Sequence, residues 1–421
     1  MIGIFSSSKT KFTQITLGIL AALFLSVFIY EEHFFNTWRH PLFSSFFAIL
    51  GFFMLLQLSR LSAFVCGSSI GILWFYWIGL SFRFYDLTYL IPLVWIFVAL
   101  IFGIFFLALC YFKTPIYRIS VLLCASFIHP FGFNWFIPEL TLTQSYFFPS
   151  KSILALLLIL LVIFSFLIQK QFYKISFLWL ILGLFSIGIF SQTLYPTPKE
   201  SPLKIKTIST NIPQNLRWDS SNLKQIIDEN FSLIQQAKQE KYDLVILPET
   251  AFPIALNAED SLLKILQDLS QDLTILVGAI HKQGNSYYNS AYLFNQGEMQ
   301  IFDKIILVPF GEKIPLPQFF VDLINQIFFK GGMDFTTNSN QKPNSTILQN
   351  QHFQIAICYE ATRQEFYQDS PSFLIAISNN AWFKPSIEPT LQKLLMRYFS
   401  LNYGTTIYHS SNGSQDFILS P

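Results

Sequence analysis

Three residues of types that cooperate in nucleophilic catalysis each follow a short apolar run in the second half of the chain. Glu249 comes after residues 245–247 and Pro248, Lys304 comes after residues 299–303, and Cys358 comes directly after residues 354–357. A cysteine nucleophile needs a base to take its proton and a donor to stabilise the oxyanion. A carboxylate and an ammonium group can fill these roles, so the three residues are candidate catalytic groups.

Each of the three residues also has an ordinary structural explanation. A cysteine after an apolar strand is usually a small core side chain. Lys304 could be a solvated surface charge, and Glu249 after Pro248 could interact with the positive end of a helix dipole. The choice between these interpretations depends on the elements that position the three side chains.

The composition divides the chain into two halves. Of its 421 residues, 52% are hydrophobic and only 12% are charged, whereas soluble proteins carry about 25% charged residues. Asp and Glu are sparse up to about residue 195 and frequent beyond it, and the long apolar runs end at the same point. We therefore predict a membrane domain over residues 1–195 and a globular domain over residues 202–421.

Apolar runs of about 18 residues are long enough to span a bilayer as helices. We expect about seven transmembrane helices, at residues 12–30, 41–58, 62–82, 88–112, 119–136, 152–168 and 175–193. The first run lacks a small-residue cleavage site and is expected to remain as an anchor. The fifth contains His129 and Pro130, so its end is either a kinked helix with interfacial aromatic residues or a loop that helps to admit a lipid.

The basic residues predict the orientation of these spans. With the N-terminus in the cytoplasm, the inner connections carry Lys9, Lys11, Arg60, Lys113, Arg118, Lys170 and Lys174, and the outer ones carry Arg39, Arg83 and Lys151. Seven against three favours this orientation, because cytoplasmic connections are enriched in Lys and Arg. An odd number of spans then places residues after about 195 on the outer face, which in a bacterium is the periplasm.

Composition also limits the classes of ligand. The formal net charge is +2 and no dense Lys or Arg cluster occurs, so we expect no nucleic-acid partner. Cys66, Cys110 and Cys124 lie in apolar runs, and Cys358 is the single cysteine of the polar half. This spacing fits neither a zinc site nor a disulfide framework, and we expect no metal and no cofactor.

In the globular half, short β-branched runs alternate with polar stretches of helical period. We predict helices at 220–239, 259–270 and about 388–402, and strands at 204–209, 243–247, 273–279, 289–295, 299–303, 353–358, 373–378 and 417–419. This order is α/β, and a layered sandwich fits it better than a barrel. The candidate residues follow strands, where open α/β sheets place their sites.

The strings around the candidate residues resemble a known family. Glu249 within residues 247–250, Lys304 upstream of residues 307–312, and Cys358-Tyr359-Glu360 resemble the Glu-Lys-Cys triad of the nitrilase (carbon–nitrogen hydrolase) superfamily. Residues 210–214 with Trp218, and residues 378–383, are similar to its membrane branch, the apolipoprotein N-acyltransferases. The resemblance covers nearly the whole chain and implies a multi-span helical domain followed by a nitrilase-like αββα sandwich.

The resemblance also implies roles for individual residues. Glu249 would be the base, Cys358 the nucleophile that carries a thioester, and Lys304 an oxyanion partner. Glu312, Trp218, Tyr359 and Glu360 match supporting residues of the family. The alternative explanation is core packing for Trp218 and Tyr359, and an ion pair for Glu360. The expected partners are the membrane, a phospholipid acyl donor and a diacylglyceryl apolipoprotein acceptor, with the protein acting as a monomer in the inner membrane.

Three further expectations complete this interpretation. Phe310, Trp382 and Phe383 are hypothesised to shield the thioester from water. Members of the family usually end in another transmembrane helix, which is not found before Pro421. Two rival functions stay open: a membrane-tethered amidase or nitrilase-type hydrolase of a small amide, and a non-catalytic lipid-binding or transport protein. The runs contain almost no ionisable residue apart from His129, which speaks weakly against transport.

Overall fold

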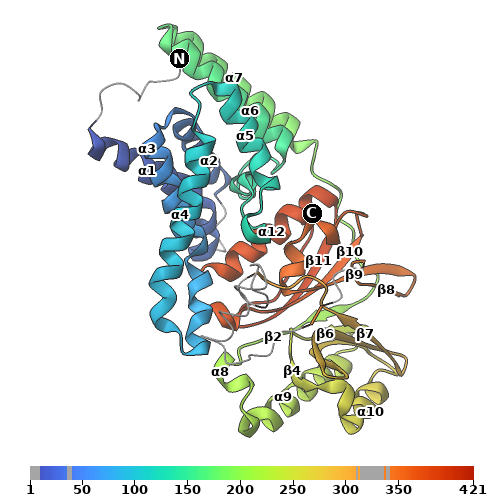
Figure 1. Cartoon of the computed structure of the whole chain (residues 1–421). Coiled ribbons are helices and arrows are strands. Elements are labelled where there is room, and N and C mark those ends of the chain that lie inside the picture. Colours follow the sequence, from blue (N-terminus) through green and yellow to red (C-terminus); the bar gives the residue numbers. More distant parts are fainter. Residues whose placement is uncertain (1–9, 36–39, 310–311, 313–335, 338–341) are drawn as a thin grey trace.

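The computed structural model describes residues 10–35, 40–309, 312, 336–337 and 342–421. The helices within residues 11–192 gather at one end of the molecule (Figure 1). The two sheets lie at the other end together with helices α8 (Gln214–Arg217), α9 (Ser220–Gln239) and α10 (Asp260–Leu269), and helix α12 (Glu388–Tyr403) lies between the two ends. Phe310 lies outside the described residues, so its predicted shielding role stays a prediction.

The N-terminal half is a bundle of apolar helices. They are α1 (Lys11–Phe34), α2 (Pro41–Gln57), α3 (Arg60–Phe75) with its 3₁₀ continuation η1 (Tyr76–Tyr85), α4 (Ile91–Leu109), α5 (Pro115–Cys124), α6 (Lys151–Gln169) and α7 (Tyr173–Gln192). Within the described residues, five helical segments are long and apolar enough to cross a membrane: 11–34, 60–85, 88–109, 151–169 and 173–192. The protein is therefore a multi-pass membrane protein.

The other two predicted spans fall on shorter helices. Residues 41–58 correspond to α2, which has 17 residues, and residues 119–136 begin in α5, which ends at Cys124. Between Phe127 and the start of α6 at Lys151, the helical structure consists of two short 3₁₀ turns, η4 (Pro130–Gly132) and η5 (Pro138–Leu142). Proline donates no backbone hydrogen bond, and Phe131 has a φ of +56°, so the helix cannot continue through this segment.

Two sheets form the sandwich of the C-terminal half. The first has the order β1-β3-β5-β6-β7 with β4 paired to β5, and the second has the order β12-β11-β10-β9-β8 with β2 paired to β11. The strands are β1 (Ile205–Thr207), β2 (Ser209–Thr210), β3 (Leu244–Ile246), β4 (Phe252–Ala255), β5 (Thr274–Gln283), β6 (Ser286–Asn295), β7 (Glu298–Asp303), β8 (Ser345–Leu348), β9 (Gln351–Ile357), β10 (Phe373–Asn379), β11 (Thr406–Asn412) and β12 (Phe417–Leu419).

Most predicted elements of this half are present. Helices α9 (Ser220–Gln239) and α10 (Asp260–Leu269) lie where the periodicity placed them, and the predicted strand at 204–209 is divided into β1 and β2. Strands β4, β8 and β11 were not predicted. Strand β11 reads Thr-Ile-Tyr-His-Ser-Ser-Asn, all buried, and its polar composition gives no strand signal because its hydroxyl and amide groups bond inside the protein.

The sandwich has a continuous apolar interior. Ile246 and Leu276 of the first sheet and Ile355 and Ile375 of the second belong to one buried cluster between the sheets. The outer face of the first sheet packs with residues of α9 and α10 in a second cluster. These two clusters bury both faces of the first sheet and the apolar faces of α9 and α10, as a stable layered fold requires.

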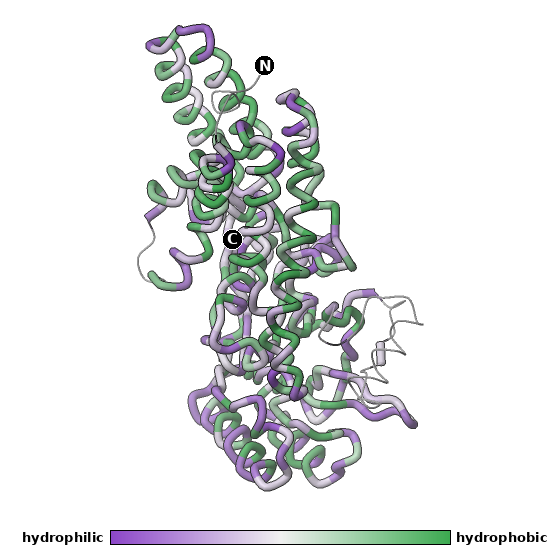
Figure 2. The backbone as a smooth tube through the Cα atoms, turned by 60° about the vertical axis from the view of Figure 1, so that its left-hand side comes forward, coloured by the Kyte–Doolittle hydropathy of each residue, from purple (hydrophilic) through white to green (hydrophobic). Residues whose placement is uncertain are grey.

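The outer face of the second sheet joins the membrane half. Leu374 and Ala376 of β10 belong to the same buried cluster as Leu391 of α12, Trp77 of η1 and Leu154 of α6. Figure 2 shows that hydrophobic residues dominate the helical end, while hydrophilic residues concentrate on the helices at the opposite end. The sandwich is therefore packed directly onto the membrane helices.

Candidate active site

Glu249 lies just past the end of β3 at a tightly packed corner. It is 5% exposed, and the next residue, Thr250, has a φ of +48°. Gly278 of β5 makes this corner possible: a Cβ there would lie 2.5 Å from the Thr250 N atom and 2.6 Å from the Glu249 Cα atom. Only glycine avoids that overlap, so β5 fixes the position of Glu249.

Arg217 supports the same corner from the other side. Its Nη1 atom donates to the backbone oxygens of Glu249 and Thr250, at 2.8 and 3.1 Å, and to the Thr250 hydroxyl. Its side chain is buried, and burial, partly opposed by the charge of Glu249, lowers the pKa of Arg217 to about 10. Arg217 comes directly before Trp218, and the sequence did not predict its role at this corner, because a buried arginine has no apolar signature.

Lys304 follows β7 and lies in a cage of carboxylates. Its Nζ atom is 3.5 Å from Glu249 Oε1 and 2.8 Å from Glu312 Oε2. Asn289 of β6 donates through Nδ2 to Glu249 Oε1 at 2.6 Å and to Glu312 Oε1 at 3.3 Å. The structure therefore brings three predicted site residues, Glu249, Lys304 and Glu312, into one network, and adds Asn289.

The charges of this network balance around the lysine. Burial alone would lower the pKa of Lys304, which is 1% exposed, but the carboxylates of Glu312 and Glu249 outweigh burial and raise it. Lys304 is thus held as an ammonium ion. Glu312 is fixed in turn by the Val308 N–H, which donates to its Oε2 at 2.9 Å.

Cys358 ends β9 and starts a short 3₁₀ turn, η8 (Cys358–Thr362), in a strained backbone conformation. Its φ is +56°, a left-handed value that costs energy in a residue with a Cβ and is often found at functional sites. Its side chain is partly exposed. The Gln392 side chain of α12 donates through Nε2 to the Sγ atom at 3.9 Å.

Electrostatics link this thiol to the carboxylate network. Burial and then the charge of Glu249 raise the pKa of Cys358 well above its usual value, and Lys304 acts in the opposite direction. Glu249 and Lys304 therefore both act on the charge state of this thiol. A thiol of raised pKa is protonated at neutral pH, so it reacts only with a base beside it.

Glu360, two residues after the cysteine, is a structural carboxylate. It is fully buried and accepts hydrogen bonds from the N–H groups of Ile305, Ile306 and Ile357 at 2.7, 3.0 and 2.8 Å. Backbone N–H groups therefore supply the hydrogen bonds of the Glu360 carboxylate, and they take the place of the ion pair that the sequence analysis offered as an alternative. It ties the segment after Lys304 to the end of β9, and so holds the lysine and the cysteine in register. Burial raises the pKa of Glu360 to about 7, against the opposing effect of the Ile357 N–H.

Tyr359 connects the turn after the cysteine to the membrane half. Its hydroxyl donates to Gly132 O and accepts from Asn134 N, both at 3.2 Å, and its ring stacks on Phe133 and Trp135. The segment around Pro130, predicted as a kinked helix end or a lipid-admitting loop, therefore packs directly against the candidate site.

The remaining predicted residues occupy different environments. Trp218 is 46% exposed, so core packing does not explain it. Trp382 packs on Phe84 and Tyr85, and Phe383 packs on Trp77. These two aromatic residues thus join the sandwich to η1 of the membrane half, and their role as a shield for the thioester stays a hypothesis.

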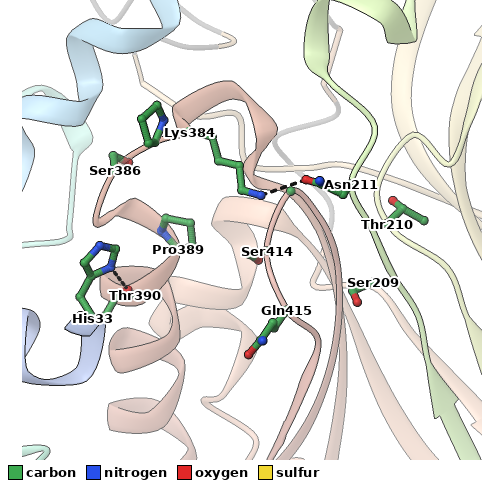
Figure 3. A pocket seen from close by; sticks show the side chains of 12 residues that line it. His33, Ser209, Thr210, Asn211, Lys384, Ser386, Pro389, Thr390, Ser414 and Gln415 are labelled. Atoms are coloured by element: carbon green, nitrogen blue, oxygen red, sulfur yellow. Dashed lines mark hydrogen bonds between the residues drawn. The ribbon is translucent and has the colours of Figure 1, made fainter. Parts of the chain in front are cut away.

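An open groove lies beside the site, where α1, α12 and the β2 and β11 ends meet (Figure 3). His33 bonds Thr390 at 2.9 Å on one side, and Lys384 donates to Asn211 at 2.9 Å on the other. Glu249, Lys304 and Cys358 do not line this groove. Hydrogen bonds nevertheless connect its wall to the thiol, from Ser414 through Asn380 and Gln392 to Cys358.

Comparison with known proteins matches both halves of the chain. Residues 12–186 match the apolipoprotein N-acyltransferase integral membrane domain, and residues 211–409 match the carbon–nitrogen hydrolase family. The apolipoprotein N-acyltransferase of Wolinella succinogenes is 40% identical over 421 residues, which is 100% of this chain and 99% of that protein. The chain belongs to the apolipoprotein N-acyltransferase family.

Two further relatives carry the same name. The apolipoprotein N-acyltransferase of Helicobacter pylori is 41% identical over 90% of this chain and 88% of its own length. That of Campylobacter jejuni is 40% identical over 95% of this chain and 88% of its own length. A member of this family is an acyltransferase, and the nitrilase-type α/β sandwich packed on membrane helices is the architecture that the sequence predicts.

Two residues that contact the predicted site residues had no sequence signal. Asn289 lies inside a strand and Gln392 lies on a helix, each among many similar polar residues of the chain. Spacing cannot select them, because their importance comes from the approach of distant elements. Among the described residues, no group of three or more His, Cys, Asp or Glu is arranged to hold a metal ion.

Proposed function

We propose that this protein transfers an acyl chain from a membrane phospholipid to the N-terminal α-amine of diacylglyceryl-cysteine in apolipoproteins, through a thioester on Cys358. The observation that carries the proposal is the network of Glu249, Lys304 and Glu312, whose charges act on the thiol of Cys358, a residue in a strained backbone conformation. A base and a fixed cation next to a thiol are the groups that acyl transfer through a thioester requires.

In the first half-reaction, Glu249 takes the thiol proton as the sulfur attacks the ester carbonyl carbon. The oxyanion that forms is stabilised by the Lys304 ammonium, which Glu312 and Asn289 hold in place through the network already described. The ester C–O bond then breaks, Glu249 returns the proton to the leaving alkoxide, and a lysophospholipid departs. Cys358 now carries the acyl group.

In the second half-reaction, the neutral α-amine of the acceptor attacks the thioester. Glu249, ionised again, takes a proton from the amine nitrogen. The C–S bond breaks, the amide is released, and the proton passes to the thiolate to restore the enzyme. A site shielded from water favours the amine over hydrolysis.

The contact with the membrane half supports lipid substrates. Tyr359 adjoins the nucleophile and bonds the 132–134 segment of the membrane half, and Phe383 packs on Trp77. Two bilayer-anchored substrates react faster at a site fixed on the membrane, because the acyl chain need not cross water. We place the protein in the bacterial inner membrane as a monomer, with its N-terminus in the cytoplasm and its sandwich in the periplasm.

A product assay tests this function against that of a small-amide hydrolase. The purified full chain in phospholipid-containing micelles, given a diacylglyceryl-cysteine peptide, should form lysophospholipid and N-acylated lipopeptide in equal amounts. Cys358→Ser should form neither product above background. Ammonia release from a simple amide, with no acylated lipopeptide, would instead identify an amidase. Full function of Cys358→Ser in cells would favour a non-catalytic lipid-binding protein.

A further inference from the structure

One face of α12 lies against the nucleophile, Cys358. Glu388 and Gln392 are four residues apart, so they lie on the same side of the helix, one turn from each other. Gln392 is fully buried and reaches the Cys358 sulfur, while Asn380 Nδ2 fixes its Oε1 atom at 3.0 Å. The turn of α12 that carries Glu388 is therefore held beside the thiol.

Glu388 is a buried carboxyl group with an unused oxygen. It is 1% exposed, and its Oε2 atom has no hydrogen-bond partner among the described residues. Leaving such an atom unpaired in the protein interior is unfavourable, because the hydrogen bonds that it makes with water in the unfolded chain are lost. The residue opens α12, where a carboxylate could cap backbone N–H groups, yet its own N–H bonds Ser386 Oγ and its Oε2 caps none of the described N–H groups.

Glu388 interacts electrostatically with two candidate catalytic residues, Glu249 and Cys358. Burial and then the charge of Glu249 raise the pKa of Glu388 well above its usual value, and Glu388 in turn acts on the thiol. The same turn borders the groove of Figure 3 through Ser386 and Thr390. The unpaired oxygen thus belongs to a residue that acts on the charge of the thiol and whose neighbours Ser386 and Thr390 border the groove. No polar group in the described part of the chain meets that oxygen.

We propose that Glu388 is a binding residue for the acceptor amine: its free oxygen accepts a hydrogen bond from the amine nitrogen while that nitrogen attacks the thioester. This inference rests on the proposed function and assigns Glu388 to the second half-reaction. An uncharged primary amine has two N–H groups. Glu249 removes one proton as the C–N bond forms and the C–S bond breaks, and Glu388 holds the other N–H, which remains in the amide.

The geometry separates the two half-reactions. The phospholipid ester brings no N–H group to its carbonyl carbon, so acylation of Cys358 has no use for an acceptor at Glu388. The amine does. A residue that merely supported the fold would affect both steps equally, whereas an amine-binding residue affects transfer alone.

The test compares three variants of the full-length protein in micelles. Glu388→Leu removes both carboxyl oxygens at similar volume, and Glu388→Gln keeps one carbonyl oxygen. Ser400→Ala is the matched control, because Ser400 is another buried residue of α12 whose side-chain oxygen has no partner within the described ranges. Ser400 lies about 18 Å along the helix from Glu388, at 1.5 Å per residue.

Each variant is measured in single-turnover experiments for thioester formation and for transfer from the isolated thioester to a diacylglyceryl-cysteine peptide, and its melting temperature is recorded. For Glu388→Leu we expect acylation within threefold of the unmodified protein, transfer at least tenfold slower, and a melting temperature that does not fall, because an unpaired buried carboxyl has been removed. Glu388→Gln should retain transfer within threefold, and Ser400→Ala should change neither step.

Equal loss of both steps in Glu388→Leu, or undiminished transfer, would overturn the role of Glu388. If Glu388→Leu does not fold, Glu388→Ala, which also removes both carboxyl oxygens, takes its place: transfer slowed at least tenfold with acylation intact supports the acceptor-oxygen role, and undiminished transfer or equal loss of both steps contradicts it. Failure of the unmodified protein to form any thioester would instead overturn the proposed function itself.

Discussion

At the scale of single residues, Lys304 is the cation that allows two carboxylates to share one buried site. Lys304→Met leaves Glu249 and Glu312 without their partner. Removing one member of a buried ion pair costs about 3–5 kcal/mol, and losing one oxyanion partner slows catalysis by about 10²–10³-fold. We expect a lower melting temperature and a lysophospholipid burst at least 100 times slower. In the control Lys206→Met, which alters a surface pair with Glu240, an equally slow burst would contradict this role.

Glu360 gives a prediction that depends on pH. Its pKa is raised from 4.5 to about 7 by burial, so between these values the folded protein holds a proton that the unfolded chain has lost. Folding stability from this group is fully present below pH 4.5 and declines as pH rises through about 7. The melting temperature should therefore fall more steeply over this window in the unmodified protein than in Glu360→Gln. Parallel curves would show that Glu360 does not titrate there.

At the scale of elements, the approach of β5 to the Glu249 corner is the tightest constraint on the base. Gly278→Ala places a methyl group against backbone atoms that cannot move independently, and overpacking of this kind costs about 1–3 kcal/mol. Because the displaced atoms belong to Glu249 and Thr250, we expect a large loss in the rate of thioester formation and only a moderate fall in the melting temperature. Thioester formation and melting temperature should be measured together.

Gly284→Asn is the matched control for that substitution. Gly284 lies in the turn after β5 and has a φ of +61°, and a Cβ added there would meet no other described atom within 4 Å. Asparagine tolerates this left-handed conformation, so acylation should be unchanged. A Gly278→Ala protein that acylates as fast as Gly284→Asn would contradict the positioning role of β5.

The sequence predicts those elements whose signals are local. Helices α9, α10 and α12 and strands β3, β5 and β10 have clear periodicity or β-branched runs, and the residues after strands include Glu249, Lys304 and Cys358. The break after α5 has a local signal in Pro130, but the sequence left open whether the segment beyond it is a kinked helix end or a loop. The polar strand β11 pairs with strands that lie far from it along the chain, and its own residues carry no strand signal. Asn289, Arg217 and Glu388 could not be found for the same reason, since only packing brings them to the site.

At the scale of the whole molecule, the sandwich and the membrane helices share one buried cluster. Lys393 of α12 pairs with Glu32 of α1 at 2.6 Å, and Arg83 of η1 donates to the Lys384 backbone oxygen at 2.5 Å. Residues 202–421 expressed alone would expose the apolar face of α12 and the second sheet. We expect this fragment to aggregate, as judged by size-exclusion chromatography. A monomeric, soluble fragment would show that the shared core is dispensable.

The excess of basic residues in the inner connections predicts which side of the membrane holds the site. An alkaline phosphatase moiety, which is active only outside the cytoplasm, should be active when fused after Pro421 and inactive when fused after Lys113. This expectation follows from the enrichment of Lys and Arg in cytoplasmic connections, which predicts that Lys113 is inside and residues after about 195 are outside. The reverse pattern of activity would place Cys358 in the cytoplasm and contradict the proposed substrates.

The central claim is that Cys358 carries the acyl group, and one measurement tests it most directly. Mass spectrometry of the intact protein after incubation with phospholipid alone should show the mass of one acyl chain on the peptide that contains Cys358, removable by hydroxylamine. Glu249→Gln should lack this adduct because its thiol has no base. A protein that forms N-acylated lipopeptide while Cys358 is never acylated would contradict the account.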